Sequence, residues 1–188
     1  MRSIIFFFIF FFQSSFLNSI EIKNVATVNN SSITNYDVIK RVALLEKIQN
    51  KKILVEDYYL IIQNLIDEKV KEIEIENNKI KIDMQIVKEQ FNKKYPNFNK
   101  NQFDNKIKDF LIKKIQIDLQ WNVLLNKKFY NKLAVNLSEI NEVMKSRNIS
   151  NDKKEDFILL EKNKKLVSIS NNYFNLIKSK TYIEIFNE

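Results

Sequence analysis

Three carboxylates, Glu68, Glu72 and Glu76, form the clearest set of side chains whose spacing could serve a reaction. They recur every four residues, so a helix would place them along one face. A general acid made from such a group needs an apolar or like-charged pocket. No such pocket is marked in the sequence, and lysines alternate with these carboxylates. The pattern therefore predicts a solvated helix face, and we predict no catalytic residue.

The residue types that are missing narrow the chemistry further. The sequence has no glycine, histidine or cysteine. Without glycine, the loops that bring backbone close to a phosphate cannot be built in their usual form, which excludes the common nucleotide-binding folds. Without histidine or cysteine there is no imidazole base, no thiolate nucleophile and no favoured ligand for zinc or copper. We predict no metal site, no cofactor and no nucleotide partner. An enzyme that uses carboxylates alone is the least favoured alternative.

The charge is positive but dispersed. The 31 Lys and Arg residues exceed the 23 Asp and Glu residues, giving a formal net charge of +8, and the two signs are interspersed. This predicts a mildly positive field and not a phosphate-binding stripe. The surplus of Lys, Asn, Ile and Phe is typical of an AT-rich genome. We therefore predict no nucleic-acid partner from the basic composition.

The first residues have the pattern of an export signal. Arg2 is followed by an apolar run from Ile4 to Phe12 and then by the polar stretch Gln13–Ser15, with Ser19 as a small residue before the cleavage site. This predicts a secretory signal peptide over residues 1–19, and hence a periplasmic protein. The apolar run is shorter than the roughly 20 residues that span a bilayer. A leader that is retained as a membrane anchor is the alternative. The remaining chain is long enough for one domain.

Strand signals occur only near the two ends. Val25 to Val28 alternates with polar residues, and the following Asn29 and Asn30 favour a tight turn, which predicts a hairpin that ends near Ile33. Tyr182–Ile185 alternates in the same way. Because an isolated strand is unstable, we predict that both termini meet in one small sheet.

The segments between these strands have helical periodicity. Thr34 and Asp37 form a capping box for the first helix. Later start signals are Asp83, Asn99 with Gln102, and Ser138. The expected helices are residues 34–49, 55–77, 83–95, 103–129, 138–147 and 157–177, with a linker at residues 148–154. The sequence thus predicts a mainly α fold with a small sheet.

Several strings, taken in this order, resemble the N-terminal domain of SurA-type periplasmic chaperones. They are Val28–Asp37, Leu65–Lys69, Ile80–Ile82 before a helix, and Gln120–Trp121 leading to Lys127–Phe129. The likeness covers Val25 to Met144. Leu176–Ile185 resembles the C-terminal segment of the same family, in which a last helix and strand return to the N-terminal domain. The resemblance implies a multi-helix chaperone domain at residues 20–147 and a C-terminal helix and strand at residues 148–188 that pack back on it.

The sequence departs from this family at one place. Members normally carry one or two parvulin-type peptidyl-prolyl isomerase domains between the two segments, and residues 147–154 stand there instead. Parvulin domains use glycines and often histidines in their active sites, and this chain has neither. We therefore predict no isomerase activity and do not expect an enzyme.

The resemblance implies an ATP-independent holdase that binds unfolded outer-membrane β-barrel proteins. Aromatic side chains on the helices are the candidate peptide-binding residues. The alternative is that most of them are core residues, since helical spacing is typical of packing, whereas Tyr59 and Tyr130 lie beside the apolar stripes and are expected to be exposed. The candidates are Tyr58, Tyr59, Phe91, Phe110, Trp121, Phe129 and Tyr130. The lysine excess supports a second class, a basic helical adaptor that docks a folded partner or an anionic surface. The sequence leaves the oligomeric state open.

Overall fold

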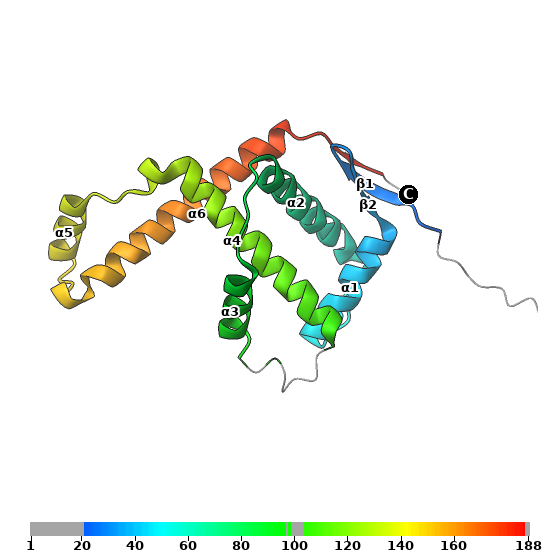
Figure 1. The fold of residues 1–188 in the computed structure, drawn as a ribbon, viewed down its shortest axis with the longest axis horizontal. Helices are drawn as coiled ribbons and strands as arrows, with labels where there is room; N and C mark the ends of the chain where they lie inside the picture. The colour runs from blue at the N-terminus through cyan, green and yellow to red at the C-terminus, as the bar shows by residue number, and fades with distance from the viewer. Residues whose placement is uncertain (1–20, 97, 99–103, 187–188) are drawn as a thin grey trace, which may run out of the picture.

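The computed structural model describes residues 21–96, 98 and 104–186. These residues form a mainly α fold with one small antiparallel sheet (Figure 1), which confirms the predicted fold class. Short 3-10 turns at Val55–Asp57 and Asn151–Lys153 precede α2 and α6. The elements are β1 (Asn24–Val28), β2 (Ser31–Thr34), α1 (Asn35–Gln49), α2 (Tyr58–Asn77), α3 (Met84–Lys94), α4 (Asn105–Leu133), α5 (Leu137–Ser146), α6 (Lys154–Lys180) and β3 (Ile183–Ile185). The expected leader, residues 1–19, lies outside the described residues.

The sheet joins the two ends of the chain, as predicted. Its strand order is β2-β1-β3, and both pairings are antiparallel. Asn29 has a φ of 51° in the turn of the hairpin, where Asn tolerates the left-handed region. Its backbone N–H donates to the Tyr182 carbonyl at 2.8 Å. Ala26 and Val28 of the central strand are fully buried.

The first helix begins and ends as its sequence predicts. The Asp37 N–H donates to the Thr34 hydroxyl, and the Asp37 carboxylate accepts from the Thr34 N–H at 2.9 Å, so the capping box is complete. Asn50 ends the helix in the left-handed conformation. Val38 and Val42 bury one face of α1 against Ile61 of α2.

The second helix is the central element of the body. Ile66 and Val70 of α2 pack under the sheet, while Ile75 joins a cluster formed with α4 and α6. α2 therefore contributes side chains to separate parts of the core. It lies between the sheet, α1, α4 and α6 in Figure 1.

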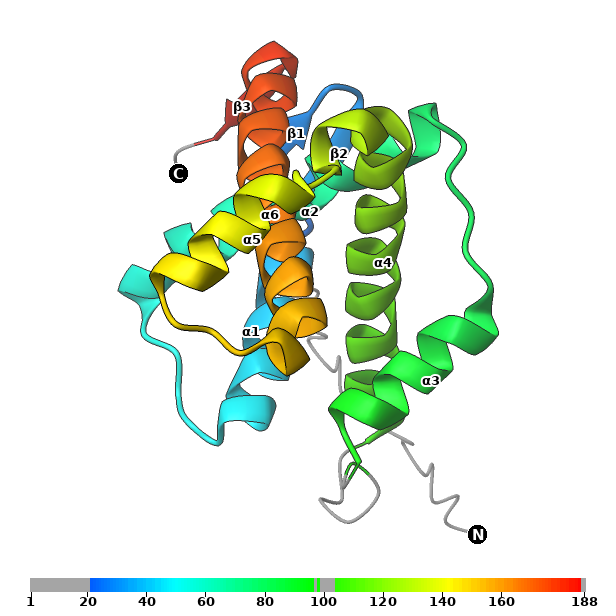
Figure 2. The ribbon, with the colours of Figure 1, turned by 90° about the vertical axis from the view of Figure 1, so that its left-hand side faces the viewer.

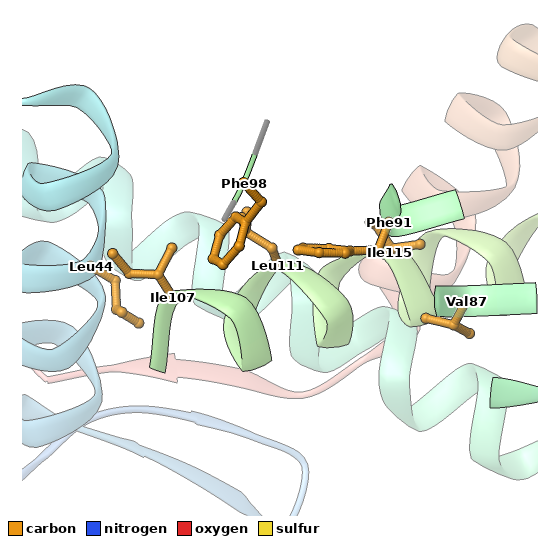
Figure 3. Close-up of a cluster of buried hydrophobic side chains, with 7 residues drawn as sticks. All are labelled: Leu44, Val87, Phe91, Phe98, Ile107, Leu111 and Ile115. Carbon is orange, nitrogen blue, oxygen red and sulfur yellow. The ribbon is translucent and has the colours of Figure 1, made fainter. Parts of the chain in front are cut away.

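The third and fourth helices share a cluster of buried aliphatic and aromatic side chains (Figure 3). Phe91 of α3 meets the Phe98 ring edge-on, with ring centroids 5.1 Å apart. Asp83 caps α3, as predicted, through a bond from the Gln85 N–H. Asp104 caps α4, because its carboxylate accepts from the Ile107 N–H at 3.0 Å. The cap expected from Asn99 and Gln102 lies outside the described residues.

The fifth helix and the start of the sixth form an arm. We use this name for residues 137–165, which extend away from α1, α2 and α3 in Figure 1 and lie side by side in Figure 2. Its small core consists of Ile140, Met144 and Phe157. The helix start expected at Ser138 is wrong by two positions. Asn136 is the cap, and its side chain accepts from the Ser138 N–H at 3.0 Å.

Candidate functional site

The three regularly spaced carboxylates of α2 do not form one solvated face, which corrects the prediction from their spacing. Glu76 is exposed, but Glu68 and Glu72 lie between helices and are ion-paired. Their cationic partners come from α1 and α4. Glu68 and Glu72 therefore connect the helices of the body.

The Arg41–Glu68 pair has the geometry of a strong ion pair. The two Arg41 guanidinium N–H groups donate to the two Glu68 carboxylate oxygens at 3.1 and 2.6 Å. The same guanidinium lies 4.8 Å from the centroid of the Phe110 ring, in a cation–π arrangement. Arg41 is thus held by α2 on one side and by α4 on the other.

Glu72 lies between two ammonium groups. Its carboxylate is 3.0 Å from Lys69 Nζ on its own helix and 3.0 Å from Lys113 Nζ on α4. Burial acts to raise the pKa of Glu72, but the hydrogen bonds from Lys113 and Lys69 outweigh it and leave the pKa below its ordinary value. Glu72 is therefore an anion at neutral pH and is unsuited to the role of a general acid.

A groove runs between α1 and α4, and we call it the α1–α4 groove. It has a volume of about 610 Å³. Its lining combines apolar and aromatic side chains with both signs of charge, and cations outnumber carboxylates. The residues are Tyr36, Asp37, Lys40, Arg41, Ala43, Leu44, Lys47, Leu65, Lys106, Asp109, Phe110 and Lys113.

The seven candidate aromatic residues do not gather in one place. Phe91 and Trp121 are buried in two different clusters and form part of the core. Phe110 lines the α1–α4 groove, and Tyr58 packs partly against the cluster between α1 and α2. Phe129 packs partly against the Trp121 cluster.

The two tyrosines expected on the surface are exposed. Tyr59 is 59% exposed near the start of α2, and Tyr130 is 78% exposed near the end of α4. Tyr59 has exposed apolar neighbours in Leu54, Val55 and Leu60. We call these four residues, which are exposed and close in sequence at the start of α2, the apolar corner.

Trp121 is fixed by a contact with α6 that the sequence does not reveal. The indole N–H donates to the Ser170 hydroxyl at 2.9 Å, and the Trp121 ring stacks on Tyr173 with centroids 5.7 Å apart. Phe129 meets the same Tyr173 ring edge-on at 5.2 Å. These aromatic side chains attach α6 to α4.

A polar network completes this attachment. The Tyr173 hydroxyl and the Lys128 ammonium both donate to Glu74 Oε1, and Lys128 also donates to the Tyr173 hydroxyl at 2.7 Å. Burial raises the pKa of the Tyr173 hydroxyl, and its bond to Glu74 raises it further. For Glu74, burial is outweighed by the hydrogen bonds from Tyr173, Lys128 and Asn78, so its pKa is lowered.

The arm and the turn of α6 next to it carry apolar side chains whose exposure sequence reasoning missed. Phe157 is the one residue of α6 that is buried, while Leu159, Leu160 and Val167 are exposed. Leu160 and Val167 lie seven residues apart and line the same shallow hollow. The sequence gives no signal for this exposure, because Leu160 and Val167 lie in phase with Phe174, which packs against the Trp121 cluster.

Over residues 21–96, 98 and 104–186, no group of three or more carboxylates could hold a metal ion. In the same residues, no helix is long and apolar enough to cross a membrane. A scan against protein-family models finds no match for the chain, and a search of curated proteins finds no matching sequence.

Proposed function

We propose that the protein is an ATP-independent holdase of the periplasm that binds unfolded outer-membrane β-barrel proteins. The leader pattern and the resemblance to SurA-type chaperones give the compartment and the class of client. The observation that carries the proposal is an exposed apolar surface on α6, formed by Leu159 and Leu160 of the arm and by Val167 just beyond it.

The arm suits a client that has no fixed shape. Its residues 137–165 extend from the body in Figure 1, and Lys165 marks the junction, since its ammonium donates to the Ala134 carbonyl at 2.7 Å. Barrel strands alternate apolar and polar side chains and are rich in aromatic residues. An exposed apolar helix face can bury such side chains one at a time, at about 25 cal/mol per Å².

Modest affinity is expected for each contact. An unfolded client loses conformational entropy when a segment is ordered on the chaperone, and this offsets part of the apolar burial. The apolar corner around Tyr59 and the exposed Tyr130 provide further contacts on other elements. Several weak contacts along one client chain would give retention through avidity without ATP.

The proposal is tested by the affinity for one barrel protein in two states, unfolded and prefolded in detergent, each at low and moderately high salt. We expect selective binding of the unfolded form that persists at high salt, because apolar burial is not screened. Exchange of Leu160 and Val167 for Glu should weaken binding about tenfold, through lost burial of two side chains. The matched control places Glu at Met84 and Ile86, which are exposed on α3.

Two results would contradict the holdase. Equal affinity for the folded and the unfolded client would rule out a holdase, because a holdase prefers unfolded chains. Binding that vanishes with salt would instead support the basic adaptor, which the lysine excess favours. If the leader is retained, the same domain acts at the membrane surface, and the mass of the mature N-terminus distinguishes the two forms.

A further inference from the structure

The strand β3 has an outer edge on which no other strand of the described residues pairs. It lies at one side of the three-stranded sheet, and β1 is its neighbour on the inner side. In an antiparallel pair, alternate residues direct their N–H and C=O groups toward the partner strand, and the residues between them direct these groups away from it. The bonds at the inner edge of β3 therefore show which groups lie at its outer edge.

The hydrogen bonds to β1 identify the residues whose backbone groups face inward. The Asn29 N–H donates to the Tyr182 carbonyl at 2.8 Å, and the Phe186 N–H donates to the Val25 carbonyl at 3.0 Å. Tyr182 and Phe186 therefore direct backbone groups toward β1. Glu184 lies midway between them and does the same, because the direction alternates along a strand.

Ile183 and Ile185 consequently direct their N–H and C=O groups toward the outer edge. Within the described residues, these four groups have no hydrogen-bond partner. The edge of β2 at the other side of the sheet is partly closed, since the Thr34 N–H donates to the Asp37 carboxylate at 2.9 Å. The outer edge of β3 thus offers two donors and two acceptors in the arrangement that an added strand requires.

The two faces of β3 differ in character. Ile183 and Ile185 are half-buried and pack against the cluster under the sheet. On the other face, the exposed Glu184 lies between Tyr182 and Phe186, which are 61% and 38% exposed. The Tyr182 hydroxyl donates to the Glu184 carboxylate at 2.8 Å, and Glu184 forms no ion pair with another described residue. A strand added at this edge would meet apolar side chains on one face and an unpaired carboxylate on the other.

The position of Glu184 argues against a second copy of this chain as the added strand. Glu184 is the middle residue of the three-residue β3. Two copies of β3 that paired antiparallel through both outward residues would place Glu184 opposite Glu184, and like charges directly opposite each other destabilise a strand pair. A lysine or arginine at the opposite position would instead form a cross-strand ion pair. The edge therefore fits a strand that has a cation between two apolar residues.

We propose that the outer edge of β3 binds an extended segment of an unfolded client as a fourth, antiparallel strand with the pattern apolar–basic–apolar. The two apolar residues exchange backbone hydrogen bonds with Ile183 and Ile185, and the basic side chain pairs with Glu184. This rests on the proposed function and deepens it, because it assigns a client subsite and a client preference. Barrel strands alternate apolar and polar side chains, so they suit this edge. The backbone bonds give affinity, and the alternate side chains give the preference.

The test uses the labelled peptide Asn-Thr-Val-Lys-Val-Thr-Asn and the full chain, with affinity measured by fluorescence anisotropy. In a second peptide both Val residues are N-methylated, which removes the two donors that would face β3. In a third peptide the Lys and the Thr after the second Val are N-methylated instead, where the N–H groups would face solvent. We expect the second peptide to bind about tenfold more weakly than the first, through the loss of two hydrogen bonds, and the third to bind within about twofold of it.

Amide chemical shifts and a proline variant locate the subsite. In nitrogen-15-labelled protein, the first peptide should shift the amide signals of Ile183 and Ile185 more than that of Glu184, whose N–H faces β1. The variant Ile185→Pro removes one outward donor but no bond to β1, and we expect it to weaken binding of the first peptide about fivefold. Ile185→Val keeps the donor and is the matched control.

Reversal of the charge tests the register of the added strand. Glu184→Lys should bind the first peptide about threefold more weakly than the wild-type chain and should prefer a peptide with Glu in place of Lys. Glu142→Lys makes the same change of charge at an exposed position of α5 and should keep the original preference. An unchanged preference in Glu184→Lys would overturn the proposed pairing.

The outcomes separate this proposal from the holdase. Equal weakening by both N-methylated peptides would overturn the added strand, because the direction of the backbone groups would then have no effect. A dimer of the free protein that Ile185→Pro dissociates would make the edge an interface between two copies, which also overturns the proposal. A preference for unfolded over folded barrel protein that persists in those cases leaves the holdase intact. The predicted peptide pattern without that preference supports the edge and contradicts the holdase.

Discussion

Glu74 of α2 takes part in the attachment of α6 to the body. Its carboxylate accepts hydrogen bonds from Tyr173 on α6, Lys128 on α4 and Asn78 at the end of its own helix. Glu74→Gln keeps the shape but removes the charge that strengthens these bonds. We expect a loss of about 2 kcal/mol in the free energy of unfolding, measured by denaturant titration. Glu76→Gln, at an exposed position, should change it little.

The variant Glu74→Gln also tests how the contribution of Glu74 to the free energy of unfolding depends on pH. The folded-state pKa of Glu74 lies below its ordinary value, so its contribution is present above the unfolded pKa and is lost as pH falls through the folded pKa. The stability difference between the wild-type chain and Glu74→Gln should therefore be full near neutral pH and shrink in acid. A difference that stays constant down to pH about 2 would show that shape, and not charge, causes the effect.

Some features of single residues could be predicted from the sequence and others could not. Thr34 and Asp83 were predicted as helix caps and are caps, because a cap acts within a few residues of itself. At Asn136 and Ser138 both side chains suit the role equally, and the choice between them depends on local backbone geometry. The burial of Glu68 was missed because its partner Arg41 lies 27 residues away in sequence.

The strand β3 contributes two isoleucines to the core under the sheet, and replacing them tests how far the sheet depends on this strand. Ile183 and Ile185 pack partly against the cluster that buries Ala26 and Val28. Replacing both isoleucines by Asn should lower the free energy of unfolding by about 2–3 kcal/mol. It should also speed amide exchange at Asn29, whose N–H donates to the Tyr182 carbonyl. The matched control is Ile22→Asn, which makes the same change at an exposed position.

Slow exchange at Asn29 in the β3 variant would contradict this account, because it would mean that the hairpin is stable without its third strand. The sheet was predictable as an element, since only two segments of the sequence alternate like strands. Its order was not, because the sequence does not show which strand of the hairpin receives β3. The structure places β1 in the centre.

The helices were predictable to within a few residues, but the arm was not. Periodicity shows that α6 is a helix and that Leu166, Tyr173 and Ile177 share a face. It does not show that α6 continues beyond α4 and α2, so that Leu160 and Val167 stay 48% and 59% exposed. Exposure of this kind is a property of tertiary arrangement, which one sequence does not encode in its local pattern.

At the scale of the whole molecule, the small core of the arm predicts uneven stability. Ile140, Met144 and Phe157 form a cluster separate from those of the body. Segments with few buried contacts open at lower free energy than the global unfolding. In hydrogen exchange, the amides of α5 should therefore exchange well before those of α4 around Trp121. Asn136→Ala removes the cap of α5 and should speed exchange in α5 about fivefold without moving the global thermal midpoint.

If the amides of α5 exchanged only through global unfolding, the arm would not open separately from the body. The arm and the body would then be one cooperative unit. The same experiment bears on the holdase. An arm that opens locally can adjust its apolar surface to different client segments, whereas a rigid arm would select among them.

The sheet that joins the termini also determines when the molecule can be complete during synthesis. The Tyr182 N–H donates to the side chain of Asn29 across 153 positions of sequence. Until those last residues exist, one edge of β1 stays open and can pair with other chains. Contacts of such long range close slowly. β1 is therefore made long before it gains β3 as its second neighbour, and in that interval its open edge resembles the aggregation-prone segments that a chaperone has to guard.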